Sequence, residues 1–105
     1  MESEASIQRL ILEFLSGIGI YCWRNNNAGI FDPRTGKYRS PGKFSIPGVS
    51  DIFGFHKGKF FAIEVKKQGS NPTQAQKDFM EAVRINGNIA FVARSIGDVK
   101  LGLTL

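Results

Sequence analysis

A short turn between two apolar segments is the feature that most constrains the fold of this 105-residue chain. Residues 52–55 and 59–67 are rich in aromatic and β-branched side chains, and the dipeptide Lys57-Gly58 separates them. This pattern predicts a β-hairpin with a two-residue loop. With that loop, Asp51 lies directly opposite Glu64, with Cβ atoms roughly 4.5–5.5 Å apart.

The predicted hairpin gathers two carboxylates and a lysine in apolar surroundings. Side chains alternate along a strand, so Glu64 and Lys66 share the face of Asp51, roughly 7 Å from each other. Like charges directly opposite each other destabilise a sheet, and a divalent cation would offset the repulsion. Magnesium takes carboxylate, carbonyl and water oxygens, and Lys66 beside it could hold a water or a phosphate. The alternative is a pair of solvated carboxylates with Lys66 as an ordinary ion-pair partner.

Charge and composition narrow the function classes. The net charge of +5 favours a polyanionic partner, of which nucleic acid is the commonest. The sequence shows no Cys/His cluster for zinc and no phosphate-binding loop for a nucleotide, and one histidine, His56, gives little support to histidine-based catalysis. No apolar run approaches the roughly 20 residues that span a membrane, and we see no secretion signal. The single cysteine, Cys22, argues weakly for a reducing compartment. We therefore expect one cytoplasmic domain over residues 1–105, encoded by a bacterium or a phage.

Hydrophobic periodicity predicts the remaining elements. Residues 4–17 fit an amphipathic helix, residues 20–24 a strand, and residues 89–93 a buried strand. A second helix begins at Thr73 and stops before Gly87, and residues 95–100 fit a short helix. The order α-β-β-β-α-β predicts an α/β fold, in which a small mixed sheet is flanked by helices.

Two helical side chains admit two interpretations each. Glu4 falls on the inward-facing stripe of the first helix, where it either reaches a buried site or sits at a frayed helix start favoured by the helix dipole. Gln76 lies three residues after Thr73 in a capping-box pattern. It either serves only the cap or also points toward the hairpin.

A long irregular stretch, residues 25–50, interleaves basic and aromatic side chains and contains a turn-rich piece that fits a small hairpin. Cations for phosphates and rings for stacking suit a flap over nucleic acid, whereas the alternative is a solvated basic loop. The side chains concerned are Arg34, Lys37, Arg39 and Lys43, with Phe31, Tyr38 and Phe44.

Together these residues resemble the VRR-NUC branch of the PD-(D/E)XK nuclease superfamily. The matching segments are spread over nearly the whole chain. The pairing of an aspartate with a downstream Glu-Val-Lys is moderately specific by itself, and it becomes a strong signal together with the downstream Thr-x-x-Gln and the upstream Trp-Arg-Asn. One small departure is Ser50, where many relatives carry a proline or another small residue. The segments are residues 4–8, 23–27, 47–51, 58–66, 73–76 and 87–90.

The resemblance implies a restriction-endonuclease-like core and a metal-dependent phosphodiesterase acting on DNA. Asp51, Glu64 and the backbone carbonyl of Val65 would hold Mg²⁺ or Mn²⁺, and Glu4 would join them directly or through water. Lys66 would position the attacking water or neutralise the phosphate, and Gln76 would steady the site. The residues expected against DNA are Arg24, Asn25, Asn27, Ser50, Arg34, Lys37, Arg39 and Lys43.

Minimal members of this branch resemble Holliday junction resolvases, which implies a homodimer that resolves four-way junctions. The N-terminal helix or residues 99–105 would supply the interface. Two alternatives remain: a nuclease acting on flaps, nicks or ends, and a non-catalytic basic module that binds nucleic acid. The complete set of Asp51, Glu64 and Lys66 counts against the non-catalytic module.

Overall fold

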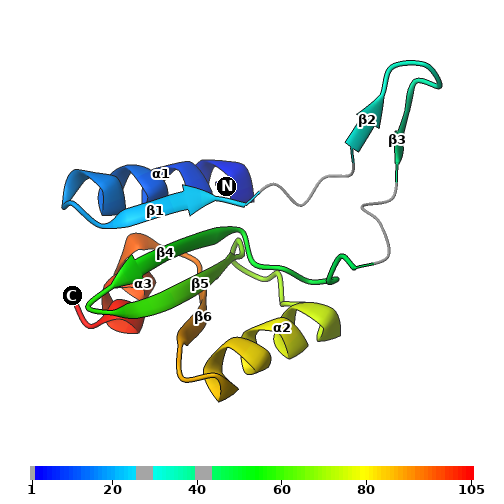
Figure 1. Cartoon of the computed structure of the whole chain (residues 1–105). Coiled ribbons are helices and arrows are strands. Elements are labelled where there is room, and N and C mark those ends of the chain that lie inside the picture. The colour runs from blue at the N-terminus through cyan, green and yellow to red at the C-terminus, as the bar shows by residue number, and fades with distance from the viewer. Residues whose placement is uncertain (1, 26–29, 40–43) are drawn as a thin grey trace.

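A four-stranded mixed sheet forms the centre of the computed structural model, which describes residues 2–25, 30–39 and 44–105 (Figure 1). The strand order is β1-β4-β5-β6, where β4 is antiparallel to both of its neighbours and β5 is parallel to β6. The α/β fold predicted from the sequence is confirmed. The strands are β1 (Tyr21–Arg24), β4 (Ile52–His56), β5 (Lys59–Val65) and β6 (Ile89–Ala93).

The β4-β5 hairpin has the predicted loop and register. Lys57 and Gly58 both adopt positive φ, at 52° and 77°, as a type I′ two-residue turn requires. His56 pairs with Lys59, and the ladder continues to the pair Ile52 and Ile63. Beyond this pair the ladder is irregular, because the Asp51 N–H also points toward β5 and donates to the Ile63 carbonyl. Asp51 is therefore not directly opposite Glu64 in the ladder, although the two carboxyl groups are close enough to interact.

Helices cover the two faces of the sheet unequally. α1 (Glu4–Gly17) and α3 (Ile96–Leu103) pack on one face, against alternate residues of β5. α2 (Gln74–Ile85) packs on the other face, against the intervening residues of β5 and against β6. The first core contains Ile7, Ile11, Leu15, Ile52, Phe61, Ile63, Val65, Ala93, Val99 and Leu103, and the second contains Ala62, Met80, Val83 and Ala90.

A second, two-stranded sheet stands clear of the main body (Figure 1). It consists of β2 (Ile30–Asp32) and β3 (Lys37–Arg39), which pair antiparallel with each other. The turn-rich piece of the sequence therefore forms the small hairpin that its composition predicts. Within the described ranges, no helix is long and apolar enough to cross a membrane.

Candidate functional site

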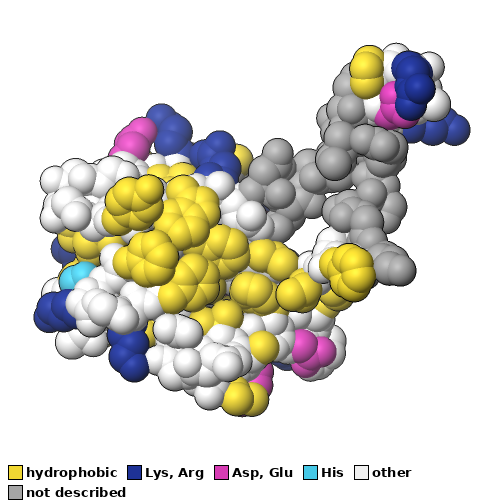
Figure 2. Space-filling view, in the orientation of Figure 1, with side chains coloured by type: hydrophobic (Ala, Val, Ile, Leu, Met, Phe, Trp, Pro, Cys, Tyr) yellow, Lys and Arg dark blue, Asp and Glu magenta, His cyan; other side chains and the backbone are white. Residues whose placement is uncertain are grey.

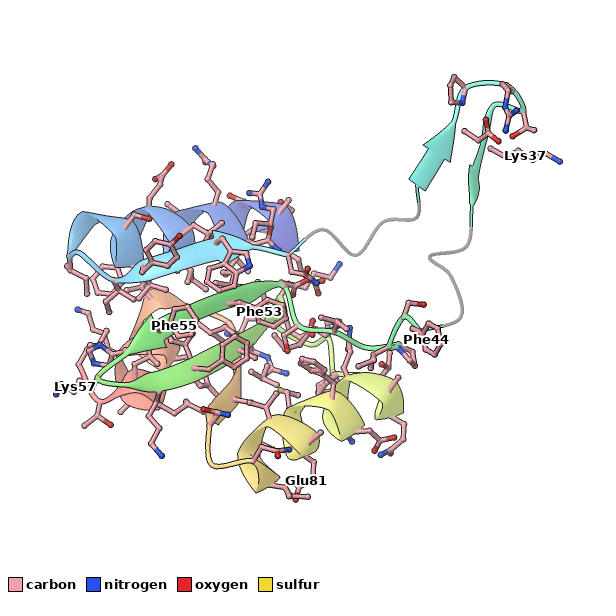
Figure 3. The ribbon with its side chains drawn as sticks, in the orientation of Figure 1. Lys37, Phe44, Phe53, Phe55, Lys57 and Glu81 are labelled. Atoms are coloured by element: carbon pink, nitrogen blue, oxygen red, sulfur yellow. The ribbon has the colours of Figure 1, made fainter. Side chains whose placement is uncertain are left out.

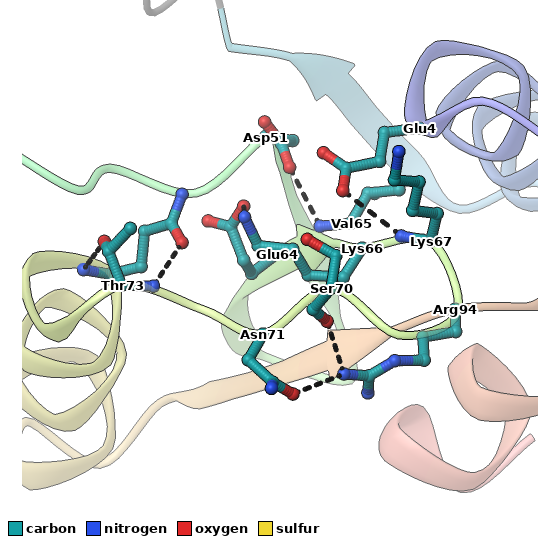
Figure 4. A network of polar contacts seen from close by, with 11 residues as sticks. Glu4, Asp51, Glu64, Val65, Lys66, Lys67, Ser70, Asn71, Thr73 and Arg94 are labelled. Carbon is teal, nitrogen blue, oxygen red and sulfur yellow. Dashed lines mark hydrogen bonds and ion pairs between the residues drawn. The ribbon is translucent and has the colours of Figure 1, made fainter.

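Asp51 occupies the point where β4 leaves β5. Its backbone N–H donates to the Ile63 carbonyl at 3.1 Å, and its Oδ2 accepts a hydrogen bond from the Val65 N–H at 2.8 Å. The side chain thus takes over the ladder bond that the departing strand no longer supplies. This bond fixes the carboxylate against the end of β5 (Figure 4).

Glu64 and Lys66 lie on the face of β5 that α2 covers, because Ala62 of the same alternating series packs in the α2 core. Glu64 is only 2% exposed and Lys66 8%, so both charged side chains are buried. The Lys66 Nζ lies 4.0 Å from the Glu64 Oε2, whereas the Glu64 Oε1 has no hydrogen-bond partner in the described part of the chain. The backbone N–H of Lys66 donates to the Ala93 carbonyl at 3.1 Å, which ties this residue to β6.

Burial and the neighbouring carboxyl group raise the pKa of Glu64 to about 8. Burial is the largest cause, followed by the hydrogen bond with Asp51 and the negative charge of that residue, and Glu4 adds a smaller contribution. Lys66 opposes these effects and lowers the pKa. One lysine therefore does not neutralise the carboxylates, and without a further cation Glu64 holds its proton at neutral pH.

The donor set fits a hard divalent cation. It offers the neighbouring carboxyl groups of Asp51 and Glu64, and Glu64 brings a buried oxygen without a hydrogen-bond partner among the residues that the structure describes. The Val65 carbonyl adds a third oxygen, because the N–H and C=O of one strand residue point to the same side and the Val65 N–H faces Asp51. Carboxylate and carbonyl oxygens suit Mg²⁺ or Mn²⁺ better than zinc.

Glu4 reaches this region from the other face of the sheet. Its Oε2 accepts a hydrogen bond from the Lys67 N–H at 3.3 Å. The carboxylate therefore lies beside the residues that follow β5 (Figure 4). Across the described residues, no three His, Cys, Asp or Glu side chains are grouped to hold a metal. The structure therefore brings Glu4 near the Asp51–Glu64 pair without making it a third member of one cluster, because α1 packs on the opposite face.

Gln76 is used by the cap of α2. Its Oε1 accepts from the Thr73 N–H at 2.8 Å, and its own N–H donates to the Thr73 Oγ1 at 3.2 Å, which forms the predicted capping box. The first turn of α2 also touches the segment that leads to Asp51, because Gly48 lies against the backbone of Ala75. The carboxamide oxygen of Gln76 is thus committed to the cap, which leaves its NH₂ group for other contacts.

Arg94 is a residue that the sequence analysis missed. Its Nη2 donates to the Ser70 carbonyl at 2.8 Å and lies 3.4 Å from the Asn71 Oδ1, while its N–H donates to Asp98 Oδ2 at 2.8 Å. These bonds anchor the loop that follows Lys66 (Figure 4). The available signal was position: Arg94 directly follows β6, and the carboxyl ends of adjacent parallel strands lie at one edge of a sheet.

Three of the residues that we expect to contact DNA lie beside the two carboxyl groups. The Asn25 N–H donates to the Asp51 carbonyl at 2.7 Å, and its side chain donates to the Ser50 carbonyl at 3.4 Å. Arg24 is exposed at the end of β1. Ser50 is fully buried. Its side chain, which was expected to contact DNA, is therefore not exposed, because the end of the strand lies beneath Asn25.

The other expected DNA contacts belong to the β2-β3 hairpin and its flanks. Arg34 and Lys37 are exposed, and the Arg34 Nε lies 3.6 Å from the Asp32 carboxylate. Lys37 extends into solvent, far from the carboxylates (Figure 3). Arg39 ends β3, but its side chain lies outside what the structure describes, as do residues Asn27 and Lys43.

Comparison with known proteins identifies the fold class. No protein-family model matches the chain, and no curated protein matches it in sequence. A solved structure described as a VRR_NUC domain protein is similar, with a TM-score of 0.63 over 93% of this chain and 82% of that one, at 23% sequence identity. The chain therefore has the fold of that domain, a restriction-endonuclease-like α/β core.

Proposed function

We propose that this protein is a metal-dependent endonuclease that hydrolyses phosphodiester bonds of DNA at Asp51, Glu64 and Lys66. The observation that carries the proposal is Glu64, which is 2% exposed beside Asp51 and whose Oε1 has no hydrogen-bond partner among the described residues. A buried polar atom left unsatisfied is costly. Lys66 and Asp51 engage part of the Glu64 carboxyl group, and the remaining oxygen, Oε1, is the one that a metal could take.

Within this proposal, Asp51, Glu64 and the Val65 carbonyl would hold Mg²⁺ or Mn²⁺. When bound, the cation lowers the pKa of a water and neutralises charge on a phosphate oxygen. Lys66 contributes a fixed positive charge from a buried position, where electrostatic stabilisation of the developing charge is stronger than in water. Lys66 is the catalytic residue supplied by this chain itself.

Three further residues act as positioning residues in this mechanism. Glu4 holds the Lys67 N–H and Arg94 holds the Ser70 carbonyl, so both ends of the segment after Lys66 are fixed. Gln76 links the cap of α2 to the same region through Thr73. These contacts keep the Lys66 backbone in place while the substrate enters.

The DNA is proposed to run from Arg24 and Asn25, beside Asp51, toward the exposed cations of the β2-β3 hairpin. Phosphate contacts carry no sequence information, so alanine at Arg34 and Lys37 should weaken binding to all sequences alike. A titration at several salt concentrations measures the effect, since each lost contact lowers the slope of log affinity against log salt by about one.

The proposed substrate is branched DNA, with four-way junctions first and flaps, nicks or ends second. It rests on the sequence resemblance to small junction resolvases and on a fold shared with a VRR_NUC domain protein. One acidic site cuts one strand, so two symmetric cuts need a homodimer.

The test is cleavage of labelled four-way junction, flap and linear duplex DNA in Mg²⁺, Mn²⁺ or EDTA. Asp51→Asn is the matched variant, because an asparagine oxygen can still accept the Val65 N–H while the charge is lost. We expect cleavage in Mg²⁺ or Mn²⁺ and none in EDTA or with the variant. Cleavage that EDTA does not diminish would rule out the metal dependence. DNA binding without cleavage in either metal would favour the non-catalytic module.

A further inference from the structure

A small hairpin with a charged tip projects from the molecule. It consists of β2 and β3, and we call its residues 30–39 the arm. The arm has three basic residues and one carboxylate, Asp32. Figure 2 shows Lys and Arg side chains at its far end, at the upper right, and Figure 1 shows the arm clear of the main sheet and helices. An isolated two-stranded hairpin is only marginally stable in water, which indicates that a partner completes the arm.

The tip of the arm has a preformed shape. The Gly36 N–H donates to the Asp32 carbonyl at 2.9 Å, and Gly36 has a φ of +69°. The Asp32 Oδ1 accepts the Arg34 N–H at 3.0 Å and lies 3.6 Å from the Arg34 Nε. The Arg34 side chain is still 87% exposed, and Lys37 is exposed beside the turn. Because a preorganised element loses little entropy on binding, the tip is suited to present these two cations to a partner.

Both ends of the arm lead back to the proposed site. On one side the Asn25 N–H donates to the Asp51 carbonyl at 2.7 Å. On the other side Gly48, three residues before Asp51, lies against the backbone of Ala75. Arg34 is nine residues from Asn25, and nine extended residues reach at most about 30 Å. This reach corresponds to roughly nine base pairs of duplex DNA at about 3.4 Å each.

The shape and charge of the arm fit the major groove of duplex DNA. Paired strands lie about 4.8 Å apart, and the major groove, about 12 Å wide, admits a two-stranded ribbon, whereas the minor groove is about 6 Å wide. The phosphates that border the groove attract exposed cations. A protein partner fits less well, because the cores of protein interfaces are depleted in charged residues. The tip, Pro33 to Lys37, has no large apolar side chain.

We propose that the arm lies in the major groove of a DNA duplex beside the cleaved phosphate, so that tight binding requires a double-stranded flank. The proposal rests on the proposed function in taking DNA as the substrate and the region of Asp51 as the place of cleavage. It adds the part of the substrate that the arm contacts, which is a duplex flank of at most about nine base pairs. Base pairs beyond this length lie outside the reach of the arm.

The test is the affinity for flap DNA whose double-stranded flank varies from roughly 4 to roughly 16 base pairs, below and above the limit set by the reach of the chain. The flank is varied on one side of the flap and then on the other. A hairpin loop closes it, so that short flanks stay paired. The comparison substrate has the same flank as a single strand. Titrations are run in Ca²⁺, and a gel confirms that the DNA stays intact.

The test variant combines Arg34→Ala with Lys37→Ala. The matched control combines Arg9→Ala with Lys100→Ala, which also removes two exposed cations, but from α1 and α3. Circular dichroism confirms that both proteins are folded. Because all four side chains are exposed, neither variant disturbs the core.

The loss of affinity in the arm variant should grow with flank length and level off at about nine base pairs. One phosphate contact contributes about tenfold to affinity at about 0.1 M salt, so the arm variant should bind the longest flank on the order of 10²-fold more weakly than the wild type. The loss should be small with a single-stranded flank, because a groove needs two strands. The control should bind as the wild type does.

Four results would overturn the proposal. A loss that does not depend on flank length shows that the two cations act by charge alone. An equal loss on the single-stranded flank places the arm on one strand rather than in a groove. A loss that keeps growing well beyond the reach of the arm has another source. An arm variant that binds every substrate like the wild type removes DNA and leaves a protein as the partner.

These outcomes are separate from those of the nuclease proposal, because no readout uses cleavage. A flank effect in a protein that does not cleave DNA would keep the arm as a duplex-binding element and reject the nuclease. Cleavage without a flank effect would do the reverse.

Discussion

At the scale of single residues, the site combines one buried lysine with two neighbouring carboxyl groups. The Lys66 Nζ is 4.0 Å from Glu64, and its side chain is 11% exposed. An ion pair on the surface contributes little to stability. A buried cation beside a reacting phosphate, in contrast, acts on charge that develops in the transition state.

Lys66→Ala should therefore lower the cleavage rate by on the order of 10²–10³ while DNA binding and fold persist. Lys67→Ala is the matched control, because Lys67 is the exposed next residue. Single-turnover cleavage with saturating enzyme measures the rate, and a binding titration in Ca²⁺ measures affinity. A Lys66→Ala cleavage rate close to that of the wild type would show that Lys66 serves only as an ion-pair partner of Glu64.

Glu64 should make the metal-free protein less stable as pH rises. Its pKa moves from an ordinary 4.5 to about 8 through burial and Asp51. Between these values the folded protein holds a proton that the unfolded chain has released. The free energy of unfolding therefore falls with increasing pH, by at most ~1.4 kcal/mol per pH unit, and the loss is complete above about pH 8.

Urea unfolding in EDTA across this pH range measures the effect. Glu64→Gln should flatten the dependence, whereas Glu81→Gln, a change at an exposed glutamate, should leave it unaltered. Metal affinity should rise over the same range, because the cation must displace the proton. A wild type whose metal-free stability is flat between pH 4.5 and 8 contradicts the raised pKa.

At the scale of elements, the segment before Asp51 is positioned by its packing on α2. Gly48 has a φ of +76°, and a Cβ there would overlap the backbone of Ala75 and Gln76. The close approach needs glycine for two reasons, space and backbone conformation. Because Gly48 is three residues from Asp51, this contact sets how the strand end approaches the site.

Gly48→Ala should destabilise the protein by about 1–3 kcal/mol more than the control Gly87→Ala, through overlap alone. Gly87 also has a positive φ, +82°, but open space around it, so alanine there costs only the backbone strain of about 1–2 kcal/mol. Chemical unfolding of both variants gives the difference. Equal losses would show that α2 yields and that Gly48 is needed for its conformation alone.

The sequence was sufficient for the elements whose information is local. The positive φ values of Lys57 and Gly58 fix the hairpin register, and that register brings Asp51 close to Glu64. Thr73 and Gln76 form the predicted cap. What could not be predicted depends on packing between elements: the side from which Glu4 approaches, the burial of Ser50, and the anchoring of the loop by Arg94.

At the scale of the whole molecule, alternation along β1 and β4 indicates which side chains share a face, but not which half of that face a helix covers. Which half of the face is covered depends on the parallel pairing of β5 with β6 and on the packing of α2 over these two strands. From the sequence, an interface is accordingly expected in the N-terminal helix or residues 99–105. The structure also exposes the aromatic side chains of Tyr21, Trp23 and Phe55 on one half of a sheet face.

Mixed dimers test how two sites act on one junction. Each protomer has one acidic site, so a dimer of wild type and Glu64→Gln should nick one strand of a four-way junction and leave the opposed strand intact. We would mix the proteins at increasing ratios of Glu64→Gln and separate nicked from fully resolved products. Because a random mixture pairs wild type with itself as the square of its fraction, resolution should fall faster than nicking. Mixing with Glu81→Gln in place of Glu64→Gln is the control, since Glu81 is an exposed carboxylate outside the site and should leave the wild-type products unchanged. If resolution and nicking instead fall together in proportion to the wild-type fraction, the two cuts come from independent monomers, and the general-nuclease alternative replaces junction resolution.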